Sequence, residues 1–99
     1  MRKAQARHVL VSSKTICSEL MKDLENGADF ADLARDFSEC PSSHSGGDLG
    51  EFFEGDMVKE FNDVVFKGKV GQIIGPIKTQ FGYHIIEIMS LKDDENDEG

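Results

Sequence analysis

The side chains that could do chemistry lie in short segments spread along the whole chain. A neutral imidazole donates one hydrogen bond and accepts another, and a thiol can act as a polar group or, when ionised, as a nucleophile. Large apolar side chains between these polar groups could form a slot for an apolar ligand. No single residue decides among these chemistries. The polar candidates are His8, Cys40, Thr79 and His84, and the apolar candidates are Leu49, Met57, Phe61 and Phe81.

The hydropathy pattern predicts an α+β domain that would position these side chains. Apolar residues recur at helical spacing in three stretches and alternate, or cluster as β-branched residues, in four others. The predicted helices run from a cap at Ser12 or Ser13 to Asn26-Gly27, from a cap at Asp29 to about Pro41, and from a cap within Glu54-Gly55-Asp56 to Gly68. The predicted strands cover residues 5–11, 49–53, 77–80 and 83–89.

The same periodicities predict which residues share a face. On the first strand His8 points to the side opposite Val9, and on the last strand His84 shares a face with Ile86 and Ile88. Within the third helix Met57 and Phe61 are expected on one face. The apolar stripe of the first helix is expected to comprise Ile16, Leu20 and Leu24, with Cys17 and Met21 alongside.

Length and charge bound the domain. Ninety-nine residues predict a single domain with a small core, and the formal net charge is −8. Residues 93–99 hold five acids and no base, so the rest of the chain has 14 acids, 11 bases and a net charge of −3. We therefore expect a folded domain over residues 1–92 and a disordered acidic tail over 93–99. The acidic balance argues against nucleic acid as a partner.

The sequence predicts a cytoplasmic monomer. No apolar stretch is long enough to span a bilayer, and the first apolar run, Val9 to Val11, is too short for a signal-peptide core. Nothing in the pattern demands an oligomer. Cys17 and Cys40 lie far apart in sequence, and two cysteines alone do not establish a disulfide.

Two motifs in the second half of the chain carry a resemblance to a known family. The segments GGDLGEF at 46–52 and QFGYHII at 80–86 follow a strand with a histidine and two helices, and a helix with a methionine and a phenylalanine lies between them. From residue 5 to residue 91, this order resembles the parvulins, which are peptidyl-prolyl cis/trans isomerases. The resemblance implies an FKBP-like superfold: a four-stranded antiparallel sheet surrounded by about four helices, with the active site on the concave side.

The resemblance also implies an activity and a set of site residues. It implies rotation about X-Pro bonds in proline-containing polypeptides, assisting their folding, without a cofactor or a metal. The matching positions give His8, Cys40, Thr79 and His84 as the catalytic group. The matching positions for substrate binding are Leu49, Met57 and Phe61 around the proline ring, with Gln80 and Phe81 beside them. Because a twisting amide needs no nucleophile, we expect Cys40 to act as a polar wall.

Two features bear on the substrate. Parvulins that require phosphorylated substrates carry a longer basic loop after the first strand, whereas here the link is Ser12-Ser13-Lys14 with a single cation. One lysine is a poor clamp for a phosphate dianion, so we expect no requirement for phosphorylation. Acidic residues expected near the site predict a preference for basic peptides. They are Glu51, Glu54, Asp56 and Glu60.

Other interpretations stay open at this point. The apolar slot could serve a peptide-binding or holdase chaperone module with little turnover. The two histidines could mainly hold the sheet together, and the apolar candidates could be ordinary core. A zinc site is chemically conceivable, although no close ligand pair supports it. Its ligands would be His8, Cys40, His44 and His84.

Overall fold

The computed structural model describes residues 2–93, and Met1 and residues 94–99 lie outside that description. In this range the chain forms four strands, three α-helices and one short 3₁₀ helix, which confirms the predicted α+β class. In chain order the elements are β1 (Arg2–Val11), α1 (Lys14–Glu25), α2 (Phe30–Phe37), the 3₁₀ helix η1 (Pro41–Ser45), β2 (Asp48–Phe53), α3 (Lys59–Lys67), β3 (Ile73–Thr79) and β4 (Gly82–Asp93).

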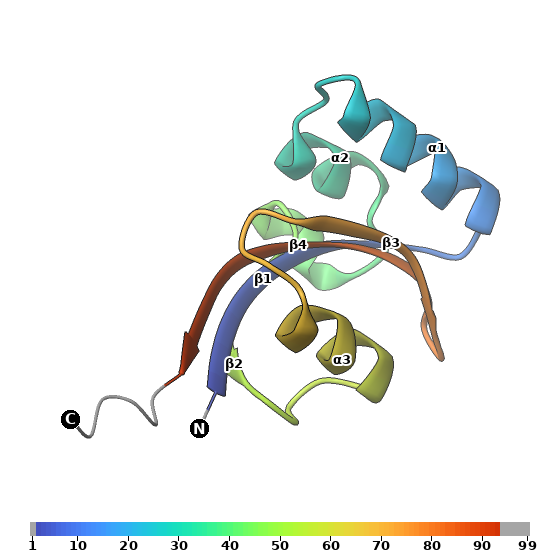
Figure 1. The fold of residues 1–99 in the computed structure, drawn as a ribbon. Helices are drawn as coiled ribbons and strands as arrows, with labels where there is room; N and C mark the ends of the chain where they lie inside the picture. The colour runs from blue at the N-terminus through green and yellow to red at the C-terminus, as the bar shows by residue number, and fades with distance from the viewer. Residues whose placement is uncertain (1, 94–99) are drawn as a thin grey trace.

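The four strands form one antiparallel sheet in the order β2-β1-β4-β3. The first and last strands of the chain are therefore the two central strands, each paired on both sides. Figure 1 shows the sheet as a curved arch, with α3 inside the curve and α1 and α2 outside it. The expected four-stranded antiparallel sheet is confirmed, and the three α-helices with the one 3₁₀ helix agree with the expected number of about four.

Each face of the sheet carries its own apolar core, as the strand alternation predicts. On the α3 side, Ala4 and Ala6 of β1 pack with Ile86 and Ile88 of β4. On the other side, residues of β1 and β4 pack against α1 and α2. That second cluster comprises Val9, Val11, Cys17, Leu20, Phe30, Leu33, Ala34 and Ile85.

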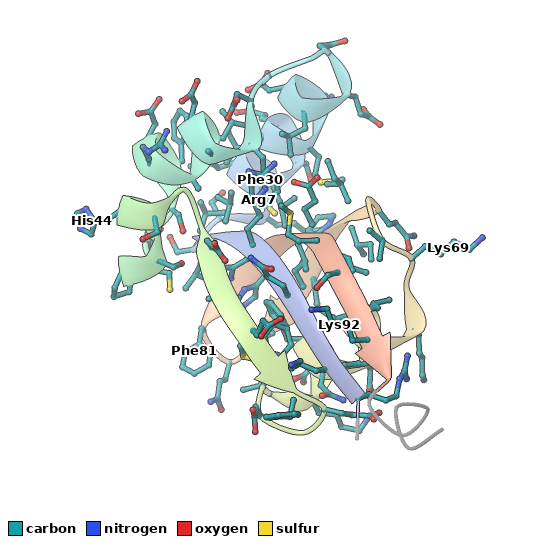
Figure 2. The ribbon with its side chains drawn as sticks, turned by 90° about the vertical axis from the view of Figure 1, so that its left-hand side faces the viewer. Arg7, Phe30, His44, Lys69, Phe81 and Lys92 are labelled. Atoms are coloured by element: carbon teal, nitrogen blue, oxygen red, sulfur yellow. The ribbon has the colours of Figure 1, made fainter. Side chains whose placement is uncertain are left out.

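One ion pair lies between the sheet and α2. Arg7 Nε lies 2.6 Å from Glu87 Oε1, and its guanidinium carbon lies 4.8 Å from the centre of the Phe30 ring. Figure 2 shows Arg7 and Phe30 together where α2 meets the sheet. Arg7 is thus paired with Glu87 and also packs on an aromatic ring.

Two of the three predicted helix caps are present in the structure. The Ser13 hydroxyl accepts from the Ile16 N–H, and the Asp29 carboxylate accepts from the Asp32 N–H, so both predicted caps are confirmed. The third predicted cap is wrong, because Asp56 accepts instead from the Phe53 N–H and closes a turn. The third helix consequently begins at Lys59, after a cap residue without a side-chain hydrogen bond.

Two face assignments change with these boundaries. Met57 lies before α3 rather than on a helical face shared with Phe61, although both contact the same core. Ile16 is 43% exposed, so the buried stripe of α1 is made by Cys17 and Leu20 instead. Ile16 lies in the first turn of α1 and faces away from the buried side chains of Cys17 and Leu20.

The last two strands are longer than predicted. The strand expected at 77–80 begins at Ile73, and its pairing with β4 shifts between Ile74 and Ile77, around the cis Gly75-Pro76 bond. A proline within a strand is accommodated by such an irregularity because it lacks an N–H to donate. Strand β4 runs to Asp93, and the rest of the predicted acidic tail lies outside the described residues.

Candidate active site

Three polar side chains form a hydrogen-bonded row across the concave face of the sheet. His8 Nδ1 on β1 lies 3.0 Å from His84 Nδ1 on β4, and His84 Nε2 lies 2.7 Å from Thr79 Oγ1 at the end of β3. In the strand register His84 faces Leu10, which places His8 diagonally across on the neighbouring strand. Side chains on paired strands at such a diagonal are within reach of each other.

The partners of Thr79 favour one direction of hydrogen bonding along the row. The Phe81 N–H donates to Thr79 Oγ1 at 3.1 Å, which leaves the hydroxyl hydrogen free to donate to His84 Nε2. His84 then carries its own hydrogen on Nδ1 and donates it to His8 Nδ1. This arrangement alone gives the buried hydroxyl hydrogen a partner among the described residues. It leaves the hydrogen of His8 on Nε2, a buried atom with no hydrogen-bond partner in that part of the chain.

Burial keeps both imidazoles neutral. His8 and His84 are 5% and 3% exposed. Burial, together with the neighbouring His84, lowers the pKa of His8 to about 4, and burial also lowers the pKa of His84. A neutral row of this kind can donate and accept hydrogen bonds at physiological pH without introducing a charge.

An apolar cavity of about 470 Å³ opens in front of the two histidines. Phe61 of α3 stands edge-on to both imidazole rings, with centroid distances of 5.7 Å to His8 and 5.8 Å to His84. The row of polar groups therefore adjoins an apolar wall. The residues lining the cavity are His8, Leu10, Glu39, Cys40, Pro41, Leu49, Asp56, Met57, Val58, Phe61, Phe81 and His84.

Most of the residues singled out in the sequence come together here. Seven of the nine predicted site residues line the cavity: His8, Cys40, Leu49, Met57, Phe61, Phe81 and His84. Thr79 lies behind this lining, buried against His84. Gln80 is exposed and is not part of the lining, so the structure does not bring it into the pocket. Phe81 is 60% exposed and projects outward in Figure 2, as a residue at the rim would.

Five lining residues escaped the sequence analysis: Leu10, Glu39, Pro41, Asp56 and Val58 as pocket walls. The sequence pointed to Asp56 as part of a helix cap and as a charge near the site, but not as a wall of the cavity. The alternation of β1 puts Leu10 on the His8 face, so that residue could have been found. Glu39 and Val58 lie in connections between elements, where no periodicity gives their orientation.

The metal-site interpretation gains no support from the geometry. Among the described residues, no three His, Cys, Asp or Glu side chains are grouped so that they could hold a metal ion. His44 is exposed on η1 and points away from the molecule (Figure 2).

The glycine motif before β2 positions His8. Gly46 and Gly47 have φ values of +67° and +88°, a region that favours glycine. This turn lets the chain run closely past β1, where the His8 N–H donates to the Gly47 carbonyl at 2.9 Å. The motif thus fixes the backbone that carries the first histidine of the row.

Comparison with known proteins identifies this arrangement. Residues 3–90 match the family model of the rotamase, or PpiC-type peptidyl-prolyl isomerase, domain. The chain belongs to the parvulin family. It is therefore a peptidyl-prolyl cis/trans isomerase domain, as the resemblance in the sequence had implied.

Solved structures and curated relatives agree with this assignment. The foldase protein PrsA of Geobacillus sp. (strain WCH70) is 48% identical over 87 residues, which are 87% of this chain and 32% of that protein. The PrsA structure from Bacillus anthracis has a TM-score of 0.90 at 41% identity, over 93% of this chain and 43% of that chain. NmPin, the parvulin of Nitrosopumilus maritimus, has a TM-score of 0.80 at 40% identity, over 91% of this chain and 98% of that chain.

The share covered differs between these relatives. This chain spans about a third of the length of the curated foldase relatives, but almost the whole of the archaeal parvulin. The parvulin domain is thus found both by itself and within longer proteins. Among the residues that the structure describes, none of the helices is long and apolar enough to cross a membrane.

Thr79 is expected to support the parvulin site through His84. Thr79→Val keeps the shape of the side chain but removes the acceptor of the Phe81 N–H and the donor to His84 Nε2. We expect a loss of about 1–3 kcal/mol in the free energy of unfolding, because buried polar groups lose their partners. We also expect kcat/KM to fall, by about tenfold for a loss of 1.4 kcal/mol in transition-state stabilisation.

Thr79→Ser is the matched control because it keeps the hydroxyl group. Denaturant unfolding and exchange NMR on a Leu-Pro peptide measure the two effects. Wild-type stability and activity in the valine variant would contradict a supporting role for the hydroxyl.

Proposed function

We propose that this domain accelerates cis/trans exchange at unphosphorylated X-Pro bonds by gripping the proline ring in the apolar cavity while the amide twists. The observation that carries this proposal is the contact between Phe61 and the row of neutral histidines. An apolar slot and a polar, uncharged edge meet there within one site. Those are the two kinds of group that a twisting prolyl amide needs.

The reaction breaks no bond between heavy atoms. Its barrier is the loss of amide resonance as the bond twists, about 18–20 kcal/mol, and uncatalysed exchange takes tens to hundreds of seconds. Catalysis therefore requires the site to bind the twisted amide better than either planar form. Holding the ring in a fixed position makes the preceding carbonyl the part that rotates.

The apolar wall and the histidine row then make separate contributions. Leu49, Met57 and Phe61 line the cavity and would exclude water from the amide. Planar resonance separates charge, so a less polar environment favours the twisted form. The rings of His8 and His84 would supply preorganised hydrogen-bonding capacity at the edge of the cavity, held in place by Thr79.

Phosphate is not expected to be part of the recognised substrate. The link between β1 and α1 is Ser12-Ser13, which holds no cation, and Lys14 follows as the first residue of α1. Neither lysine nor arginine lines the described cavity. A phosphate dianion is normally clamped by several cationic donors. The two carboxylates at the cavity, Glu39 and Asp56, would repel it instead.

Exchange NMR on tetrapeptides with Leu-Pro, Lys-Pro and phosphoserine-Pro tests this function. Faster cis/trans exchange on both unphosphorylated peptides is the expected result. Line broadening by binding, without faster exchange, would overturn catalysis and favour the chaperone module. Acceleration confined to the phosphopeptide would overturn the proposed independence from phosphorylation.

Cys40 is expected to be dispensable as a nucleophile. It is half-buried at the cavity, and no described side chain hydrogen-bonds to its thiol, so no base is placed to activate it. We expect Cys40→Ser to keep kcat/KM within about threefold of wild type, the scale of one hydrogen bond of modest strength. The same NMR assay measures this, with Met57→Ala as the reference for a damaged pocket. A serine variant as inactive as Met57→Ala would show that the sulfur itself is required.

Two expectations from the sequence concern the protein in its cell. The monomeric state and the cytoplasmic location stay predictions, which light scattering and cell fractionation can check. Proline-containing polypeptides are the expected substrates.

A further inference from the structure

Two carboxylates line the cavity, and among the described residues that line it there is no lysine or arginine. Glu39 directly precedes Cys40, and Asp56 directly precedes Met57, so the acids come from two different connections of the fold. Resting on the isomerase function above, we propose that this site selects prolines flanked by lysine or arginine. The two acids would be the residues that determine this specificity.

Each carboxylate is held in place by one backbone donor. Glu39 Oε2 accepts from the Ser12 N–H at 3.1 Å, and Asp56 Oδ2 accepts from the Phe53 N–H at 2.9 Å. In both residues the second oxygen forms none of the described hydrogen bonds. Neither acid belongs to an ion pair within residues 2–93. Residues 2–93 therefore position the two negative charges without pairing them with a cation.

Only one of the four acids that the sequence placed near the site lines the cavity. Asp56 does line the cavity, whereas Glu54 and Glu60 are exposed and outside the lining. Glu51 lies on the other face of the sheet, 3.7 Å from Lys3 Nζ and 3.5 Å from Lys92 Nζ. Figure 2 shows Lys92 across that face. The site thus has two acids of its own, and one of them, Glu39, was not anticipated.

The expected size of the preference follows from the exposure of these groups. Both acids are exposed, and ion pairs of that kind contribute about 0.2–1 kcal/mol each, which is about 1.4- to 5-fold in rate or affinity. We therefore expect kcat/KM to fall about 3- to 10-fold from Lys-Pro to the similarly long Gln-Pro peptide, and again from Gln-Pro to Glu-Pro. The differences should shrink at high salt, where exposed charges are screened.

The test compares these three peptides on the wild-type chain and on three charge variants. Glu39→Gln and Asp56→Asn keep an oxygen that can accept the backbone N–H, so the connections should retain their conformation. Each should reduce the Lys-Pro to Glu-Pro ratio severalfold. Glu60→Gln removes the same charge from an exposed position outside the cavity and should leave the ratio unchanged.

The outcomes separate this inference from the function on which it rests. Equal acceleration of all three peptides would overturn the charge preference and leave the isomerase function intact. No acceleration of any peptide would overturn the proposed function itself. An equal change in Glu60→Gln and Glu39→Gln would attribute the preference to net charge and overturn the assignment to the cavity.

Discussion

Gly47→Ala is expected to destabilise the domain by about 3 kcal/mol or more, because overpacking costs about 1–3 kcal/mol and a left-handed conformation adds about 1–2. A methyl group at Gly47 would overlap the carbonyl oxygen of His8 and lie 3.2 Å from the Cβ of Ala34. Neither neighbour can move freely, because one is the backbone of a central strand and the other is buried in α2. In a domain of this size the melting temperature should fall by at least about 12 °C.

Gly50→Ala is the matched control within the same motif. Its φ is +72°, but a Cβ there would meet nothing within 4 Å, so only the conformational cost of about 1–2 kcal/mol applies. Thermal unfolding followed by circular dichroism compares the two variants. Similar melting temperatures for both would show that close approach to β1 is not what the Gly46-Gly47 turn provides.

Lowering the pH from about 7 to about 5 is expected to remove about 2 kcal/mol of stability through His8 alone. Its pKa is about 4 in the folded chain, against an ordinary value of 6.5. Below pH 6.5 the unfolded chain therefore takes up a proton that the folded chain does not. This proton uptake stabilises the unfolded state relative to the folded state. The contribution of His8 to the free energy of unfolding is fully present above pH 6.5 and is lost as the pH falls toward 4. His84, whose pKa is also lowered, adds to the loss.

Denaturant unfolding at several pH values measures this effect. A His8→Gln variant should lose much less stability over the same interval, since it has no imidazole at that position. His44→Gln replaces an exposed histidine outside the site and should follow the wild-type curve. The same pH dependence in wild type and His8→Gln would contradict the account given for the buried pair.

The side chains of the row could be anticipated because strand periodicity is strong. Alternation on β1 and β4 places His8 and His84 on the face opposite Val9 and Ile85, and the two clusters of the core confirm it. The partner of His84 was less accessible to sequence reasoning. Thr79 reaches the histidine across the β3–β4 turn, and only the resemblance pointed to it.

The walls of the cavity were harder to predict because they come from connections. Met57 was expected on a helix, yet the turn closed by Asp56 delays the start of α3 by two residues. Glu39 follows the end of α2, where the Leu10 carbonyl accepts its N–H at 2.7 Å. Contacts of this kind join segments far apart in the sequence. The local hydropathy pattern of either segment does not predict them.

The site is built from two kinds of structure, which differ in how far a substitution disturbs the rest of the fold. Its floor is built on the two strands that are paired on both sides, so a change there disturbs the whole sheet. Met57 and Val58 line the cavity from the connection between β2 and α3, outside the sheet. Insertions or exchanges in this connection can reshape the entrance while the histidines keep their registration. Related domains can therefore change their substrate preference while the geometry of the histidine row is kept.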